Sequence, residues 1–175
     1  MRRVLSAAAG ALAMALTAGI AAAPASAQTS GPEVFTTVVV ATGASGQRQV
    51  VAGTAVAQGV FNGVGSVVEE QESTDPGAAS REDLVFRAGT LHLSGVVQHS
   101  SFSFDPLTCV FGAVVTRQGT FDGGTGQFTQ ASGTYAQITR DWGTLSRNLD
   151  GSCSPDRAPL HDVANSRITG SLATG

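Results

Sequence analysis

A glycine-rich segment over residues 119–133 constrains the fold of this chain more than any other part of the sequence. Two β-prone arms, one ending at Phe121 and one starting at Phe128, flank the sequence Asp-Gly-Gly-Thr-Gly at 122–126. Asp-Gly and Gly-Gly supply the positive-φ positions that tight turns require, so the segment predicts a β-hairpin. Small residues at 131–133 indicate a bulge, a bend or a close backbone approach in the second arm. These features together predict a strongly curved antiparallel sheet.

Strand signals recur along the rest of the chain and are separated by turns. Outside the first 27 residues, no window of helical length shows a sustained apolar repeat of helical period. A set of about eight strands favours a barrel or a sandwich, and closure removes the exposed edges of such apolar strands. We therefore predict an all-β fold, a closed antiparallel β-barrel in which the last strand pairs with the first. Strands are expected at residues 33–42, 49–57, 59–70, 84–86, 89–97, 98–104, 109–121, 128–139 and 163–172, with a break at 141–143 and a long loop at 145–161.

The first 27 residues have the pattern of a secretory signal peptide. Arg2 and Arg3 form a basic start, an Ala- and Leu-rich run follows at 4–23, and Ala-Ser-Ala at 25–27 is a small-x-small cleavage signature. The alternative is a membrane anchor, which the weak hydrophobicity of the run and the adjacent cleavage signature disfavour. We expect residues 1–27 to be removed and residues 28–175 to form a single domain that is secreted by bacterial export.

The charge of the chain argues against two classes of partner. The formal charge is −3, and the loss of Arg2 and Arg3 with the signal peptide would make it −5. The chain contains no lysine, and its arginines are scattered rather than clustered. A mildly acidic protein without a basic patch is a poor candidate for binding nucleic acid or anionic membranes.

The two cysteines, Cys109 and Cys153, both lie in the expected exported part. In an oxidising compartment such a pair predicts one disulfide, which on the chain-entropy model stabilises the fold by roughly 4 kcal/mol. The alternatives are a reactive thiol pair or half of a metal site. Neither a Cys-x-x-Cys spacing nor a nearby pair of histidines supports them, so we expect a structural bridge.

The residues of the hairpin also resemble a known family. Gly119, Phe121, the run 123–126, Phe128 and the run 131–133 are similar to the glycine-rich signature of bacterial secreted proteins with an allene oxide cyclase-like barrel. The similarity extends over roughly residues 60–135, including the 89–91 strand and the 104–109 turn. It implies the eight-stranded antiparallel barrel of plant allene oxide cyclases, dirigent proteins and some bacterial polyketide spirocyclases. In those relatives the interior binds a hydrophobic small molecule, and the enzymes steer a cyclisation or coupling. No catalytic residue is carried over, since none matches a position here.

Three residues are candidates for lining a cavity in such a barrel. Glu69 closes a long apolar strand beside Glu70, where one of the two carboxylates should face inward as a general base or a polar anchor. Tyr135 and Trp142 are the aromatic residues that carry a polar group, and such residues often lie at a pocket rim. The structural alternatives are the start of a solvated loop for Glu69 and core filling for the aromatic residues. His92 is expected at the surface.

The sequence predicts neither a metal site nor a cofactor, because its three histidines lack ligand spacing and its glycine runs are not followed by a helix. The leading functional hypothesis is the binding of an apolar small molecule inside the barrel, with no catalysis established. A second hypothesis is a cyclase- or isomerase-like enzyme that folds a reactive substrate by shape. A third is a structural or cell-envelope interaction protein whose barrel is filled by side chains.

Overall fold

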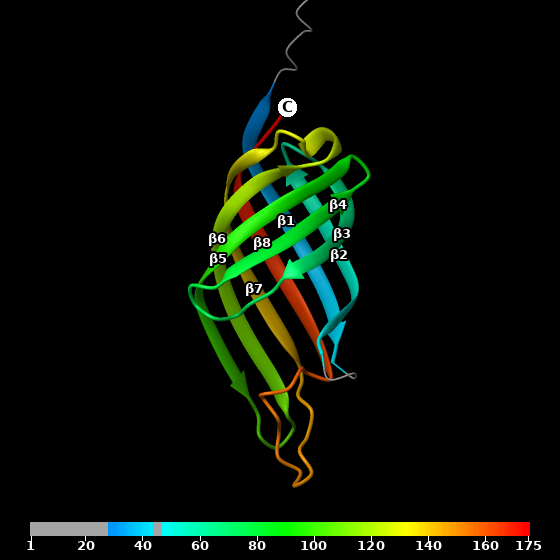
Figure 1. Cartoon of the computed structure of the whole chain (residues 1–175), viewed down its shortest axis with the longest axis vertical. Helices are drawn as coiled ribbons and strands as arrows, with labels where there is room; N and C mark the ends of the chain where they lie inside the picture. The colour runs from blue at the N-terminus through cyan, green and yellow to red at the C-terminus, as the bar shows by residue number, and fades with distance from the viewer. Residues whose placement is uncertain (1–27, 44–46) are drawn as a thin grey trace, which may run out of the picture.

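Eight antiparallel strands, each hydrogen-bonded to the next in chain order, close into a barrel in the computed structural model (Figure 1). The structure describes residues 28–43 and 47–175. The predicted signal peptide lies outside the described residues, as do residues 44–46 between the first two predicted strands. The strands are β1 (Thr29–Thr42), β2 (Gln49–Gly59), β3 (Gly63–Gln71), β4 (Ala79–Phe86), β5 (Gly89–Phe104), β6 (Val110–Gly124), β7 (Ser132–Thr144) and β8 (His161–Thr174), and a 3-10 turn, η1 (Gly126–Phe128), joins β6 to β7.

Pairing of β1 with β8 closes the sheet, as the sequence predicts. The register runs without interruption from Thr29 opposite Thr174 to Thr42 opposite His161. The all-β class and the closed barrel are therefore confirmed. No helix in the described part of the chain is long and apolar enough to cross a membrane.

The glycine-rich segment forms a longer connection than the predicted tight hairpin. β6 continues to Gly124, and β7 starts at Ser132, so the second arm does not begin at Phe128. Phe128 instead ends the 3-10 turn and is fully buried. The prediction was wrong here because burial of this ring across the end of the barrel outweighs the local preference for a short turn. The small residues of the second arm do reflect a close approach: a Cβ at Gly133 would lie 1.9 Å from the carbonyl oxygen of Ser171.

Three other parts of the chain differ from the predicted strands. The runs 89–97 and 98–104 form one strand, β5, because an irregularity in the register between Val97 and His99 lets the chain continue. Residues 141–143 do not break the pattern but belong to β7, where Trp142 pairs with Gly112. The predicted short strand at 84–86 is the end of the longer β4. A long loop does follow β7, over residues 145–160.

The interior of the barrel has an apolar half and a polar half, one above the other along the barrel axis. Near η1, the inward-facing side chains form an apolar core in which Phe35 lies 5.8 Å from Phe121 and Phe61 lies 5.1 Å from Phe128, between ring centroids. At the other end, where the β7–β8 loop extends beyond the sheet (Figure 1), many inward-facing positions are polar or charged. The candidate site lies in this second half.

Candidate functional site

The half of the barrel opposite η1 contains a cavity of about 420 Å³. Part of its wall is apolar, contributed by Val39, Phe102, Phe111, Val115, Leu145 and Ala164. The rest of the wall is strongly polar, and its charged side chains come from several strands and from the β3–β4 connection. These are Arg48, Glu69, Glu72, Glu82, Arg117 and Asp141, with Arg157 at the rim.

Arg117 lies at the centre of the polar wall and is only 3% exposed. Its Nη1 donates to Thr139 Oγ1 at 3.1 Å, and its Nη2 donates to the carbonyl oxygen of Ser73 at 3.0 Å. The same Nη2 forms an ion pair with Glu72. These bonds tie the inner face of β6 to β7 and to the β3–β4 connection. Because a buried charge is tolerated only when it is paired and hydrogen-bonded, this network explains how the guanidinium is held inside the barrel.

A second arginine, Arg48, crosses the rim of the cavity. Its Nη1 donates to Glu69 Oε2 at 2.5 Å, and its Nη2 donates to Asp162 Oδ2 at 2.9 Å. Asp162 is fully buried, and its other carboxylate oxygen, Oδ1, has no hydrogen-bond partner. The Arg48 guanidinium therefore pairs with two carboxylates, and Asp162 Oδ1 is left without a hydrogen-bond donor.

Two further carboxyl groups of the wall, Glu82 and Asp141, form no hydrogen bond with an arginine of the described residues. Glu82 accepts a hydrogen bond from Gln137 Nε2 at 3.3 Å, and Asp141 Oδ1 is buried without a partner. Burial, followed by the nearby charge of Glu72, raises the pKa of Glu82 to about 7. Burial, followed by the nearby charge of Asp162, raises the pKa of Asp141 to about 6. Both groups therefore exchange protons near neutral pH, as general acids and bases do.

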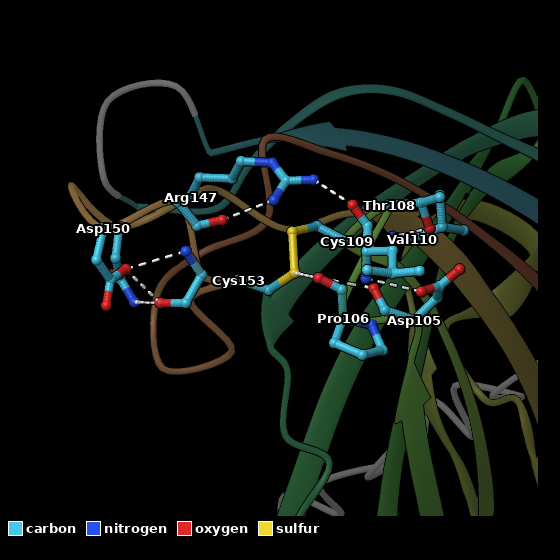
Figure 2. Close-up of a disulfide and its surroundings, with 12 residues drawn as sticks. Asp105, Pro106, Thr108, Cys109, Val110, Arg147, Asp150 and Cys153 are labelled. Atoms are coloured by element: carbon cyan, nitrogen blue, oxygen red, sulfur yellow. Dashed lines mark hydrogen bonds between the residues drawn. A yellow bond between two sulfur atoms is a disulfide. The ribbon is translucent and has the colours of Figure 1, made fainter.

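The predicted disulfide between Cys109 and Cys153 is confirmed, and it holds together the segments at the cavity mouth (Figure 2). It links the β5–β6 turn to the β7–β8 loop, and both sulfur-bearing residues are buried. Arg147 reinforces the link by donating to the carbonyl oxygens of Gly151 and Leu107, at 2.6 and 2.5 Å. The same loop contributes Pro155, Arg157 and Pro159 to the cavity wall. The bridge therefore fixes one side of the entrance.

The three candidate cavity residues lie in different places. Glu69 lines the cavity, paired with Arg48. Tyr135 is 6% exposed and belongs to the apolar core, where its ring lies 5.3 Å from that of Phe121. Trp142 is 45% exposed and does not line the cavity. The structure thus brings one of the three to the cavity and keeps the other two apart from it.

His92 is the histidine for which the sequence predicts a surface position. His92 Nδ1 is 2.6 Å from Asp83 Oδ1, and its side chain is 44% exposed. It does not line the cavity. Among residues 28–43 and 47–175, no group of three or more His, Cys, Asp or Glu side chains is arranged to hold a metal ion.

The prediction from sequence does not identify Arg117 and Glu82 as wall residues, because it does not compare each charged residue with the inward-facing apolar residues of its own strand. In β6, Arg117 has the same strand phase as Phe111, Val115 and Phe121, which all point inward. In β4, Glu82 likewise shares its phase with Leu84 and Phe86. A charged residue in the apolar phase of a strand is the sequence signal that identifies these positions.

Neither a protein-family model, nor a curated protein, nor a solved structure matches this chain.

Proposed function

We propose that this protein binds a small organic molecule in the cavity of its barrel. The observation that carries the proposal is a cavity of about 420 Å³ whose wall contains buried polar atoms without partners, among them Asp141 Oδ1 and Arg117 Nε. Unpaired buried polar groups are costly, and a ligand that supplies hydrogen bonds removes that cost. The volume lies in the range of small-molecule sites.

The composition of the wall changes the expected ligand from a purely apolar molecule to one of mixed polarity. Phe102, Phe111 and Leu145 offer an apolar surface, whereas Arg117 and Glu82 offer charge and hydrogen bonds. A wholly apolar ligand would leave the polar groups dry and unpaired, which costs free energy. A molecule with an apolar body and at least one polar group satisfies both parts of the wall.

Uptake of a neutral fluorescent probe, N-phenylnaphthylamine, tests the proposal on the mature protein. Binding should raise its fluorescence saturably, and Ala113→Trp should abolish the rise, because Ala113 lines the cavity. Val114→Trp is the matched control, since the neighbouring side chain on β6 is not part of the lining. Absence of saturable uptake, or equal loss in both variants, would count against a ligand site in the barrel.

A cyclase- or isomerase-like activity is a second candidate, favoured by the two carboxyl groups of raised pKa, Glu82 and Asp141, in one cavity. A base in such a site takes a proton from a carbon acid more effectively than a carboxylate in water. Nitrobenzisoxazole reports this directly, because loss of its ring C–H proton breaks the N–O bond and releases a coloured cyanophenolate. Ring opening that is faster with the wild type than with Glu82→Gln supports the activity; equal rates count against it.

We also propose that the barrel is of the allene oxide cyclase-like type. The support is the glycine-rich resemblance over residues 119–133 together with eight antiparallel strands in sequential order. The fold does not carry an activity with it. Failure of the eight strands to superimpose on those of an allene oxide cyclase barrel would contradict the assignment.

Secretion remains part of the proposal. The buried disulfide supports it, since such bridges persist in oxidising compartments. The mass of the protein recovered from the medium tests it, because removal of the signal peptide should leave Gln28 as the first residue. Recovery only from the cell interior, with Met1 present, would contradict it.

A further inference from the structure

The polar half of the barrel contains more carboxyl groups than buried guanidinium groups. Among the described residues, five carboxyl side chains belong to this region. Arg48 and Arg117 are the arginines that oppose them from within the wall, and Arg157 is exposed at the rim. The five groups are Glu69, Glu72, Glu82, Asp141 and Asp162. The wall is therefore short of positive charge.

The pairing within the wall shows where that charge is missing. Arg117 is occupied by Glu72, and Arg48 is occupied by Glu69 and Asp162. Glu82 receives only the amide of Gln137. Asp141 lies on β7 beside β8, the strand that carries Asp162. The region around Asp141 and Glu82 thus has no cation of its own in hydrogen-bond contact.

Two aspartates at this end of the barrel each have a carboxylate oxygen without a hydrogen-bond donor. Oδ1 of Asp141 and Oδ1 of Asp162 are both buried without a hydrogen bond, and the Asp162 side chain is 0% exposed. The unpartnered donor of the same wall is Arg117 Nε. Of these two carboxyl groups, Asp141 lines the cavity and Asp162 does not. Oδ1 of Asp141 therefore calls for an N–H group from a ligand, and a positively charged donor forms the strongest such bond.

We propose that the ligand of the cavity is an organic cation, an amine or guanidine with an apolar body, whose charge is attracted by the surplus carboxyl groups of the lining, Asp141 and Glu82. The inference deepens the proposed small-molecule function and rests on it. The apolar body packs against Phe102 and Phe111 at the outer wall. A bare metal ion fits less well, because the described residues contain no cluster of metal ligands.

The proton equilibria of the wall agree with this assignment. Burial raises the pKa of both Glu82 and Asp141, so each loses its proton only at a cost that a bound cation offsets. Glu82 is surrounded by Glu72, Arg117, Glu69 and Tyr135, and Asp141 by Asp162, Arg48 and Glu69. The carboxylates outnumber the arginines around each group.

Three probes of equal length but different charge test the proposal: octylammonium, octanol and octanoate. Titration calorimetry on the mature wild-type protein at about pH 8, where both carboxyl groups are ionised, should give the tightest binding for octylammonium. We expect the affinity for octylammonium to exceed that for octanol by roughly tenfold, because the ammonium group forms charge-assisted hydrogen bonds. The affinity for octanoate should be lower still, because its carboxylate is repelled by the carboxylates of the wall.

The variants locate the charge preference. Glu82→Gln and Asp141→Asn should each reduce octylammonium affinity toward that of octanol while octanol binding is retained. Glu70→Gln is the matched control, because it removes one carboxylate from the exposed face of β3, next to the inward-facing Glu69. It should leave all three affinities unchanged.

A second measurement on the wild type does not depend on the folding of any variant. Octylammonium affinity should fall as the pH is lowered from about 8 to about 5, whereas octanol affinity should not. If octanol or octanoate binds as tightly as octylammonium, the cation assignment is overturned although the cavity still binds ligands. If none of the three probes binds, the proposed small-molecule function itself fails.

Discussion

Arg48, the residue immediately before β2, is bound to Asp162 at the start of β8: its Nε and Nη2 both donate to Asp162 Oδ2, at 3.1 and 2.9 Å. The two residues are 114 positions apart in the sequence. Since Nη1 also donates to Glu69 on β3, one guanidinium from the segment before β2 connects β3 and β8 at the cavity end of the barrel. Barrel closure and the charge of the cavity wall therefore depend on the same side chain.

Replacement of Arg48 should destabilise the fold. Arg48→Met leaves Asp162 buried without its donor, and we expect a loss of about 2 to 3 kcal/mol in the free energy of unfolding. The value is at the low end for a broken buried pair because 26% of the Arg48 side chain is exposed. Urea denaturation measures it, and Arg167→Met on the outer face of β8 should change stability by less than about 0.5 kcal/mol. Similar effects in the two variants would contradict a structural role for the junction.

The carboxyl group of Glu82 should make stability depend on pH. Its pKa is raised from 4.5 to about 7 on folding, so the wild type loses stability as the pH rises through this interval and the buried group ionises. Glu82→Gln does not titrate and should be more stable than the wild type by roughly 1 to 3 kcal/mol above about pH 7. Below about pH 4 the Glu82 carboxyl is protonated in both the folded and the unfolded state, so its ionisation should cause little difference in stability between the two proteins. Thermal denaturation from about pH 4 to pH 8 measures the difference in stability between the two proteins. A difference that does not change with pH would contradict the prediction. The control variant Glu70→Gln should show the pH dependence of the wild type.

Loss of the disulfide should destabilise the protein by about 2 to 5 kcal/mol, since the bridge closes a segment with a sequence separation of 44. Guanidinium denaturation of the double variant Cys109→Ala/Cys153→Ala measures this loss. A reductant should lower the stability of the wild type to a similar degree and leave the double variant unaffected. Two free thiols in the denatured, unreduced wild type would show that the bridge does not form in the native protein.

Phe128 should contribute strongly to stability although it lies in a connection. Its ring is fully buried and packs 5.1 Å from Phe61, so Phe128→Ala should cost about 3 to 5 kcal/mol. Phe104→Ala is the matched control, because this ring is 38% exposed and its removal should cost less than about 1 kcal/mol. Chemical denaturation compares the two. Equal costs would mean that η1 does not close the core.

Much of the fold is readable from the sequence. Strand alternation and turn residues predict an all-β chain. A predicted strand near each end of residues 28–175 predicts closure, which the pairing of β1 with β8 confirms. The two cysteines predict a bridge, which is confirmed. These inferences succeed because they depend on local spacing or on pairing with few alternatives.

The glycine-rich segment shows where local reasoning ends. Its glycines predict a turn, and a turn is present, but Phe128 leaves the strand to fill the end of the barrel. No local signal distinguishes a phenylalanine that starts a strand from one that closes a core. The decision depends on the space left by Phe61 and Phe86, which lie in other parts of the sequence.

The sequence by itself determined that the chain forms curved strands, where most of them lie and which cysteines join. Only the tertiary structure decided what the barrel contains. Alternation tells whether a side chain points inward, but its height along the axis depends on strand register and on the irregularities in β1, β3 and β5. That register places Arg117 opposite Gln137 and brings Glu82 to the same level. Residues that look scattered along the chain thereby form one polar wall.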